Sequence, residues 1–223
     1  MVAECVNAIH GEVVRLVKLD VCGNPVTGAS SAVVVTDGFI RITPSPQYLD
    51  GQEHQQVKAN GQLCNYKRDK PQLTRVELLI DWCVLDPDAI VIVTGDTLIA
   101  NAGTTGTGVA FGEGLVTARY SLEMWQQVTG PNACDPTTGL QRYVYWAFMN
   151  VGNGKVNQFT FENAPFEFHT TGETEKVGPL WGNGPGSAGP WIPSAITNLT
   201  KHYLYNVTTT PPPVSACGAV VLA

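Results

Sequence analysis

The sequence contains little charge and almost no run of strong helix formers. Only 14% of the residues are Asp, Glu, Lys or Arg, and the net charge is −6. The largest basic cluster is at residues 67–70, which we interpret as a solvated loop, so this composition argues against binding nucleic acid by neutralising its phosphates. Glycine (23 residues) and proline (15 residues) are plentiful instead. We therefore expect an all-β fold, organised as a single domain over residues 1–223.

Long apolar runs are also missing. No stretch approaches the roughly 20 residues of a membrane-spanning helix, and the first residues lack the basic start and apolar core of a secretory signal. We expect a soluble protein that is made in a cytoplasm and has no membrane partner. The six cysteines are widely spaced without a C-x-x-C pair, which favours buried free thiols and leaves disulfides as the alternative.

Patterns for catalysis or metal binding are absent as well. The four histidines are scattered, no G-x-S-x-G motif is present, and the glycines of residues 101–114 match no nucleotide-binding loop. Carboxylate pairs such as Glu77 with Asp81 or Glu162 with Glu167 could serve as acid and base in a glycosidase, but carboxylates on a polar strand face are usually just solvated. The sequence predicts no enzyme, no cofactor and no metal.

The clearest positive signals lie in residues 74–95. From residue 74 to residue 82 apolar and polar side chains alternate, which predicts an antiparallel strand with one apolar face. Asp86 and Pro87 then provide an N-cap and a first-turn proline, and Gly95 provides a stop, so we expect a short helix between them. The β-branched content of that run leaves a second strand as the alternative.

Further strands are predicted from alternation and from β-branched and aromatic residues. They cover residues 13–19, 31–43, 116–128, 142–151, 155–171 and 201–210. Asp37-Gly38 and Gly152-Asn153-Gly154 are expected to form hairpin turns, and Pro165 is expected to mark a bulge or an edge.

The longer connections are polar or rich in glycine and proline. Pro44 and Pro46 are expected to end a strand, because proline has no N–H to donate. We interpret residues 44–72 as a long loop with one short strand near residues 55–59. The glycine-rich residues 101–114 predict a hairpin or a loop tip, and residues 172–200 predict either an extended arm or a loop attached to its own core.

Six segments together resemble a known protein family. They are NAIHGEVVRLVKLDVCGNPV from residue 7, TDGFIRI from residue 36, VKANGQLC from residue 57, LLIDWCVLDPDAIVIVTG from residue 78, NQFTFENAPFEFHTTGETEK from residue 157 and WGNGPG from residue 181. The combination resembles the major tail proteins, or tail tube subunits, of long-tailed bacteriophages (siphophages) of actinobacterial hosts. The resemblance covers nearly the whole chain and includes the order of its elements.

This resemblance implies a β-sandwich or barrel with one flanking helix, assembled as hexameric rings. The rings stack into a tube whose lumen conducts the DNA genome without specific binding and often holds the tape-measure protein. The protein would be made in the host bacterial cytoplasm and would reside in the virion tail. A ring of six chains, each with a net charge of −6, would present an acidic wall along which DNA slides.

The predicted faces and loops provide candidate residues for this function. Glu77, Asp81 and Glu123 lie on the polar faces of amphipathic strands and are the candidates for lining the lumen, with the outer surface as the alternative place for these faces. The candidates for contacts between subunits or rings lie in the long loop and in the glycine-rich arm: Tyr48, Lys67, Arg68, Trp181 and Trp191.

Other classes of protein stay open as alternatives. A capsid decoration protein or a tail-completion protein would also be a virion component, but a decoration protein would be monomeric or trimeric. A carbohydrate-binding β-sandwich would use exposed tryptophans, Trp125, Trp181 or Trp191, as a sugar platform. An enzyme would require a cleft that gathers carboxylates from distant strands.

Overall fold

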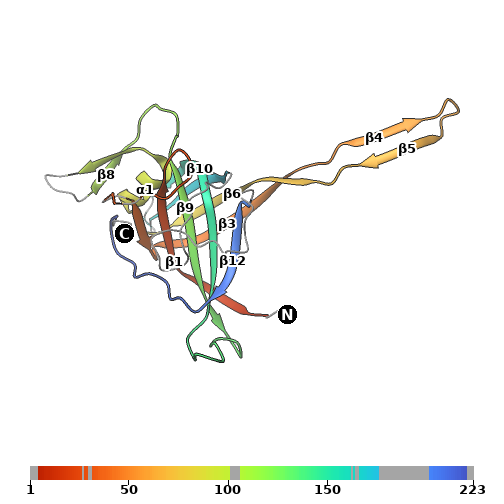
Figure 1. The fold of residues 1–223 in the computed structure, drawn as a ribbon. Helices are drawn as coiled ribbons and strands as arrows, with labels where there is room; N and C mark the ends of the chain where they lie inside the picture. Colours follow the sequence, from red (N-terminus) through yellow and green to blue (C-terminus); the bar gives the residue numbers. More distant parts are fainter. Residues whose placement is uncertain are drawn as a thin grey trace.

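The computed structural model describes residues 5–26, 28–29, 32–100, 106–161, 163, 166–175 and 201–219. Within these residues the chain is mostly β-strand, with one short helix, α1 (Pro87–Thr94) (Figure 1). This confirms the prediction of a mainly β protein with one short helix. The strands are β1 (Asn7–Leu19), β2 (Val33–Thr36), β3 (Phe39–Leu49), β4 (Glu53–Val57), β5 (Leu63–Arg68), β6 (Gln72–Trp82), β7 (Thr97–Ala100), β8 (Gly106–Ala110), β9 (Arg119–Thr129), β10 (Tyr143–Thr160), β11 (Glu167–Thr174) and β12 (Tyr203–Thr208).

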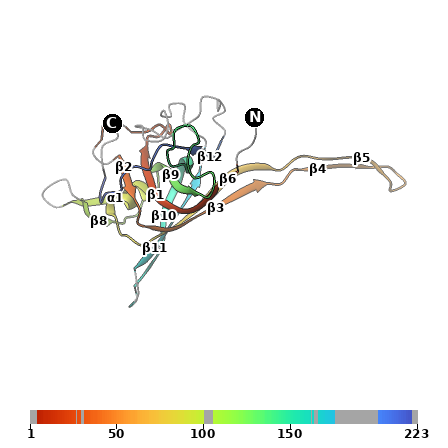
Figure 2. The same ribbon diagram turned by 90° about the horizontal axis from the view of Figure 1, so that it is seen from below.

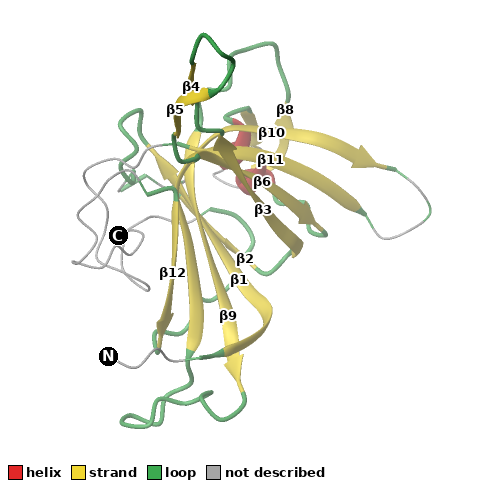
Figure 3. Cartoon of the chain, turned by 90° about the vertical axis from the view of Figure 1, so that its right-hand side faces the viewer, coloured by secondary structure: helices red, strands yellow, loops and turns green. Residues whose placement is uncertain are grey.

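Eight strands form one antiparallel sheet in the order β2-β1-β9-β10-β11-β6-β3, with β12 also paired to β10. β10 joins two halves of this sheet, because residues 143–148 pair with β9 and β12 whereas residues 151–160 pair with β11. The sheet is strongly twisted and bent (Figure 3). Within the described residues the strand order has two ends, β2 and β3, so the sheet does not close into a barrel.

The predicted strand at residues 74–82 is present as β6, and its apolar face lies at the centre of the core. Val76, Leu78, Ile80 and Trp82 are buried and pack with buried side chains of β1, β9 and α1. Complete burial of an apolar side chain of this size stabilises the fold by about 1.5–3 kcal/mol. The alternation in the sequence therefore identified the buried face of this strand correctly.

The helix begins and ends where the sequence predicts. The Asp86 side chain accepts hydrogen bonds from the backbone N–H groups of Asp88 and Ala89, at 2.9 Å and 3.4 Å. Pro87 occupies the first turn, and Gly95 ends the helix in the left-handed conformation with φ of 79°. The capping residues thus outweigh the β-branched side chains between them, which pack into the core.

The segment Gly152-Asn153-Gly154 is not a turn, contrary to the prediction. β10 runs straight through it, with a register shift against β11 between Gly152 and Lys155 and a φ of 54° at Asn153. A Cβ atom on Gly154 would lie 1.9 Å from the carbonyl oxygen of Val93 in α1. The glycine therefore allows the helix to approach the strand closely, and the segment forms a bulge in β10.

Asp37-Gly38 is not a hairpin turn either. β2 pairs with β1 and β3 pairs with β6, so the two residues carry the chain from one end of the strand order to the other. The Gly38 carbonyl accepts hydrogen bonds from the N–H groups of Cys83 and Val84, and a Cβ atom on Gly38 would lie 2.5 Å from Cβ of Val84. Close packing against the end of β6, not turn geometry, requires this glycine.

The predicted effects of Pro44 and Pro46 were also wrong. β3 continues through Pro44 and Pro46 to Leu49, because it is an edge strand and residues two apart can both turn their missing N–H toward the open side. The single strand predicted over residues 155–171 is instead parts of two strands, since β10 and β11 pair antiparallel. Pro165 itself lies outside the described residues.

Of the two expectations for the cysteines, one is confirmed and one is wrong. All six cysteines are free, as favoured, but all six are exposed, so the expectation of buried thiols was wrong. His10 and His54 are exposed, and His169 and His202 are half-buried with hydrogen-bonding partners. The glycine-rich residues 101–114 fall partly within a small hairpin of β7 and β8, as predicted, although residues 101–105 lie outside the described part.

Candidate functional site

A long hairpin arm projects from the sheet, and we define it as residues 47–74. It consists of the outer ends of β3 and β6, followed by β4 and β5. In both Figure 1 and Figure 2 the arm points away from the body, on the side opposite β8. The long loop predicted for residues 44–72 is therefore a regular antiparallel structure.

Local contacts explain why the arm is a hairpin. At its tip the N–H of Gly61 donates to the carbonyl of Lys58, Gly61 has a φ of 83°, and the N–H of Lys58 donates to the carbonyl of Gln62. This is the arrangement of a tight turn closed by a left-handed glycine. Farther down, a Cβ atom on Gly51 would lie 1.7 Å from the carbonyl oxygen of Asp69, so glycine allows the two chains to approach closely.

The arm exposes its apolar side chains. Every residue of β4 and β5 is exposed, and five large apolar side chains of the arm are between 50% and 65% exposed. A two-stranded hairpin is marginally stable in water without a third layer to cover one face. Exposed apolar groups on a projecting hairpin indicate a surface that another molecule covers. The five are Tyr48, Leu49, Val57, Leu63 and Tyr66.

Charged groups line the same arm. Lys67 and His54 both contact the carboxylate of Asp69, at 3.0 Å and 3.3 Å, and their hydrogen bonds lower the pKa of that carboxyl group. Arg68 lies 3.6 Å from Glu53. All of these groups are at least 44% exposed, so the pairs stabilise the hairpin only weakly. Their charge remains accessible to a binding partner.

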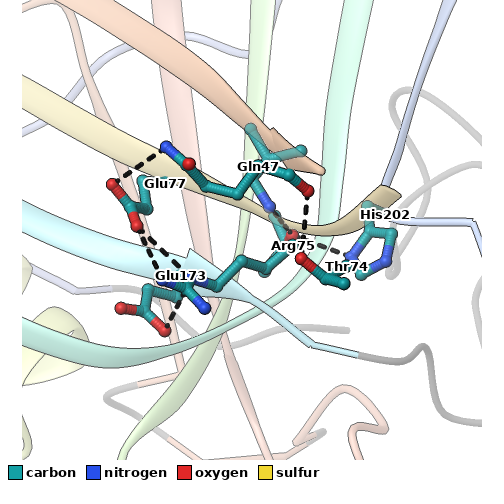
Figure 4. Close-up of polar contacts among 8 residues, drawn as sticks. Gln47, Thr74, Arg75, Glu77, Glu173 and His202 are labelled. Carbon is teal, nitrogen blue, oxygen red and sulfur yellow. Dashed lines mark hydrogen bonds and ion pairs between the residues drawn. The ribbon is translucent and has the colours of Figure 1, made fainter. Parts of the chain in front are cut away.

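A polar cluster holds the base of the arm (Figure 4). Arg75 lies between two carboxylates, 3.0 Å from Glu77 on its own strand and 3.5 Å from Glu173 on β11. The side chain of Gln47 donates to Glu77 at 3.3 Å, and the hydroxyl of Thr74 donates to the backbone carbonyl of Gln47 at 3.0 Å. These contacts join β3, β6 and β11 at the point where the arm leaves the sheet.

The pairing of β6 with β11 ends at this point. The backbone N–H of Val76 donates to the hydroxyl of Thr174 at 2.8 Å, and that hydroxyl lies 2.9 Å from Nδ1 of His202 (Figure 4). Burial lowers the pKa of the His202 imidazole, which favours its neutral form. The side chain of Thr174 thus replaces a backbone partner, and beyond it β6 continues only with β3.

A shallow polar groove adjoins this base. It has a volume of about 490 Å³ and lies between β3, β6, β10 and β11. Glu77 and Glu173 lie along it, together with Lys155 and several uncharged polar side chains. Of the three predicted lumen residues, Glu77 is therefore the one that the structure places on an accessible polar surface.

Asp81 lies close to Glu77 in the sequence but in a different environment. Its side chain is 5% exposed and contacts Arg41 at 2.7 Å and His169 at 2.7 Å. Burial alone would raise the pKa of this carboxyl group, but the hydrogen bonds from His169 and Arg41 outweigh burial and lower the pKa. Asp81 therefore joins β6 to both neighbouring strands and is not free to line a channel.

We predict that Asp81→Asn lowers the free energy of unfolding by about 1.5–3 kcal/mol at pH 7, because hydrogen bonds to a buried charged group are lost. Because the folded-state pKa of Asp81 is lowered, its stabilisation is present above the unfolded-state pKa of about 3.9 and is lost as pH falls through the folded-state pKa. Urea unfolding of wild type and variant at pH 7 and at about pH 3 would measure this difference, which should shrink at the lower pH.

Asp69 provides a matched control for Asp81. It also contacts one histidine and one basic side chain, but it is exposed on the arm. Asp69→Asn should leave the unfolding transition nearly unchanged. An equal loss of stability in both variants would show that burial of Asp81 is irrelevant.

The remaining predicted residues fall into three groups. Tyr48, Lys67 and Arg68 lie on the arm and are exposed. Trp181 and Trp191 lie outside the described residues, as does most of the arm predicted at residues 172–200, whereas residues 172–174 belong to β11 and not to an arm.

The third group consists of residues predicted on exposed faces that the structure buries. Glu123 is completely buried and bound to Arg15, so the prediction that it lies on a solvent-facing strand face was wrong. Both faces of β9 are covered around this residue. Trp125 on the same strand is also completely buried and cannot serve as a sugar platform.

Sequence reasoning missed the arm as a structure, together with Arg75 and Glu173 at its base. The signal for the arm was Asn60-Gly61, a dipeptide typical of hairpin turns, flanked by two stretches of similar length. No local signal identifies Glu173 as a partner of Arg75, because they lie on strands far apart in the sequence.

Neither a cluster of metal-ligating side chains nor a membrane-spanning helix occurs in the described part of the chain. That part contains no group of three or more His, Cys, Asp or Glu side chains placed to hold a metal ion. It also contains no helix that is long and apolar enough to cross a membrane. In comparisons with known proteins, no family model matches the chain and no curated protein is significantly similar to it.

Proposed function

We propose that the protein is a bacteriophage tail tube subunit, which assembles as stacked, hexameric rings around a lumen that conducts the DNA genome. The observation that carries the proposal is the arm, a hairpin with exposed apolar groups on a body that is otherwise a well-packed sheet. A projecting element of this kind allows a polymerising subunit to reach another subunit. The resemblance of six sequence segments to tail tube subunits supports the same function.

The arm is suited to assembly because polar contacts hold its base and because its outer part exposes apolar side chains. Arg75, Glu77 and Glu173 join three strands at the base, so the direction of the arm is set by the sheet. When another chain covers the exposed apolar groups farther out, the free energy falls by about 25 cal/mol for each Å² of apolar surface buried. The arm therefore supports contacts between subunits or rings, in which Tyr48, Lys67 and Arg68 take part.

The polar groove at the arm base is our proposed lumen surface. Glu77 and Glu173 lie along it with Lys155 and are paired with Arg75, so the groove itself is balanced in charge, whereas the chain as a whole carries a net charge of −6. The net negative charge of the assembled rings repels DNA phosphates, which allows the genome to pass without binding. In this proposal the subunit has a tail-tube-like sandwich fold, resides in the virion tail, and has itself, the tape-measure protein and the passing DNA as partners.

Negative-stain electron microscopy of the purified protein over a concentration series tests this proposal. We expect hollow rings or tubes with a central pore. A uniform population of monomers or trimers at every concentration, even with tape-measure protein added as an initiator, would contradict the proposal and favour a decoration or tail-completion protein.

A further inference from the structure

A cluster of phenylalanines reaches the surface where β10 ends and β11 begins. We name Phe111, Phe159, Phe161 and Phe166 the phenylalanine patch. Phe159 lies at its centre, with ring centroids 5.9 Å from Phe111, 6.2 Å from Phe161 and 6.4 Å from Phe166. Phe161 is 86% exposed and Phe111 is 53% exposed. Such a concentration of exposed aromatic rings indicates an interaction surface.

The core holds the patch in place. Phe159 also packs on buried Phe168, at 5.7 Å, and Phe168 stacks on Trp82 of β6 at 6.0 Å. The rings therefore form a continuous series from the core to the surface. A partner that binds Phe161 would meet a preorganised surface, which reduces the entropy lost on binding.

A groove beside the patch extends this surface. It has a volume of about 380 Å³ and is lined by Phe111, Glu113, Leu115 and Val156, with Lys155 among the other lining residues. Leu115 is 93% exposed. Asp96 and Glu113 line the groove against Lys155, and Glu167 lies at the start of β11. Among the described residues the patch is therefore apolar with a net acidic surround.

We propose that the phenylalanine patch binds the outer arm, residues 52–70, of a second copy of this chain. The outer arm has the complementary chemistry, since it exposes Val57, Leu63 and Tyr66 and carries four basic against two acidic side chains. Apolar groups then cover apolar groups, and the excess of basic charge faces the acidic surround. The inference rests on the proposed function only in treating the arm as an assembly element.

The geometry favours a contact between copies. The arm and the end of the β10–β11 hairpin, beside which Phe159, Phe161 and Phe166 lie, project from the body in different directions (Figure 2), so the two surfaces of one chain do not face each other. Two different complementary surfaces on one chain produce head-to-tail association, which closes into a ring or continues as a filament. The outer arm also has about the 20 residues that each side of a standard interface contributes.

A mixing experiment tests this contact. Leu63→Glu disables the arm and Phe161→Glu disables the patch, because each places an unpaired charge in the contact, and both sites are exposed so that folding is preserved. We expect each variant alone to associate more than about tenfold more weakly than wild type, as for a central interface residue. In an equimolar mixture the intact arm of Phe161→Glu can bind the intact patch of Leu63→Glu, and no further contact is possible. The mass measured by sedimentation should therefore be that of a dimer and should not increase further.

Val21→Glu is the matched control, because Val21 is equally exposed and lies in the turn after β1. It should associate like wild type. A mixture that sediments no faster than its components, normal association of Phe161→Glu, or a wild type that stays monomeric at millimolar concentration would each overturn the contact. If the mixture of variants forms dimers but electron micrographs of wild type contain no tubes, only the tail tube proposal is refuted. Normal tubes formed by Phe161→Glu would refute the patch alone.

Discussion

Replacing residues 53–68 by Asn-Gly should give a folded protein that no longer forms tubes. The shortened hairpin can close, because the N–H of Asp69 donates to the carbonyl of Gln52 at 3.0 Å and a two-residue Asn-Gly turn fits such a pair. The removed residues are exposed and contribute nothing to the core. We therefore expect a change of less than about 0.5 kcal/mol in the free energy of unfolding, as for surface substitutions.

Loss of assembly should be large because the arm supplies one whole side of the proposed contact. Electron micrographs of the shortened protein should contain no tubes and at most single rings. Thermal unfolding followed by circular dichroism checks that the sheet is intact. Tubes of normal length from the shortened protein would contradict both the assembly role of the arm and its contact with the phenylalanine patch.

A variant with an intact arm controls for the length of the hairpin. Gln56 and Asn65 are paired across β4 and β5, so their side chains share one face, and both are exposed. Changing both to alanine keeps the arm and its apolar side chains. This variant should still form tubes if the apolar groups make the contact.

The sequence predicted those parts of the fold whose signals are local. The strand at β6 and the helix α1 each have one buried face, and their alternation, cap and stop residues lie within a few positions of one another. The arm was missed because no face of it is buried within the chain, so it has no hydrophobic periodicity. A strand with no buried face within its own chain resembles a polar loop in the sequence.

The other predictions failed because they depend on contacts between residues that are far apart in the sequence. Gly152-Asn153-Gly154 has the composition of a turn, but Gly154 is required by the carbonyl of Val93, about 60 residues earlier in the chain. Glu123 alternates with apolar residues as a solvent-facing side chain would, yet its partner Arg15 is 108 positions away. A single sequence holds no local trace of either contact.

The buried pair of Arg15 and Glu123 joins β1 to β9. Nη2 of Arg15 donates to Glu123 at 2.9 Å, Nε of Arg15 donates to the other carboxylate oxygen, and the hydroxyl of Tyr145 on β10 also donates to Glu123. The guanidinium lies 5.6 Å from the ring centroid of Trp125. Burial alone would lower the pKa of Arg15, but the charge and hydrogen bonds of Glu123 outweigh burial and raise the pKa. The guanidinium of Arg15 is therefore charged in the folded protein.

We predict that Glu123→Ala lowers the free energy of unfolding by about 3–5 kcal/mol, because it leaves the buried guanidinium of Arg15 without its carboxylate. Such a loss is a large share of the 5–15 kcal/mol by which a domain is stable. The double change Arg15→Met with Glu123→Leu removes both charges and keeps the apolar volume, so it should cost much less than Glu123→Ala alone. Urea unfolding at pH 7 measures both values. If the double variant were no more stable than the single one, the loss would come from the cavity or from Tyr145 instead of the uncompensated charge.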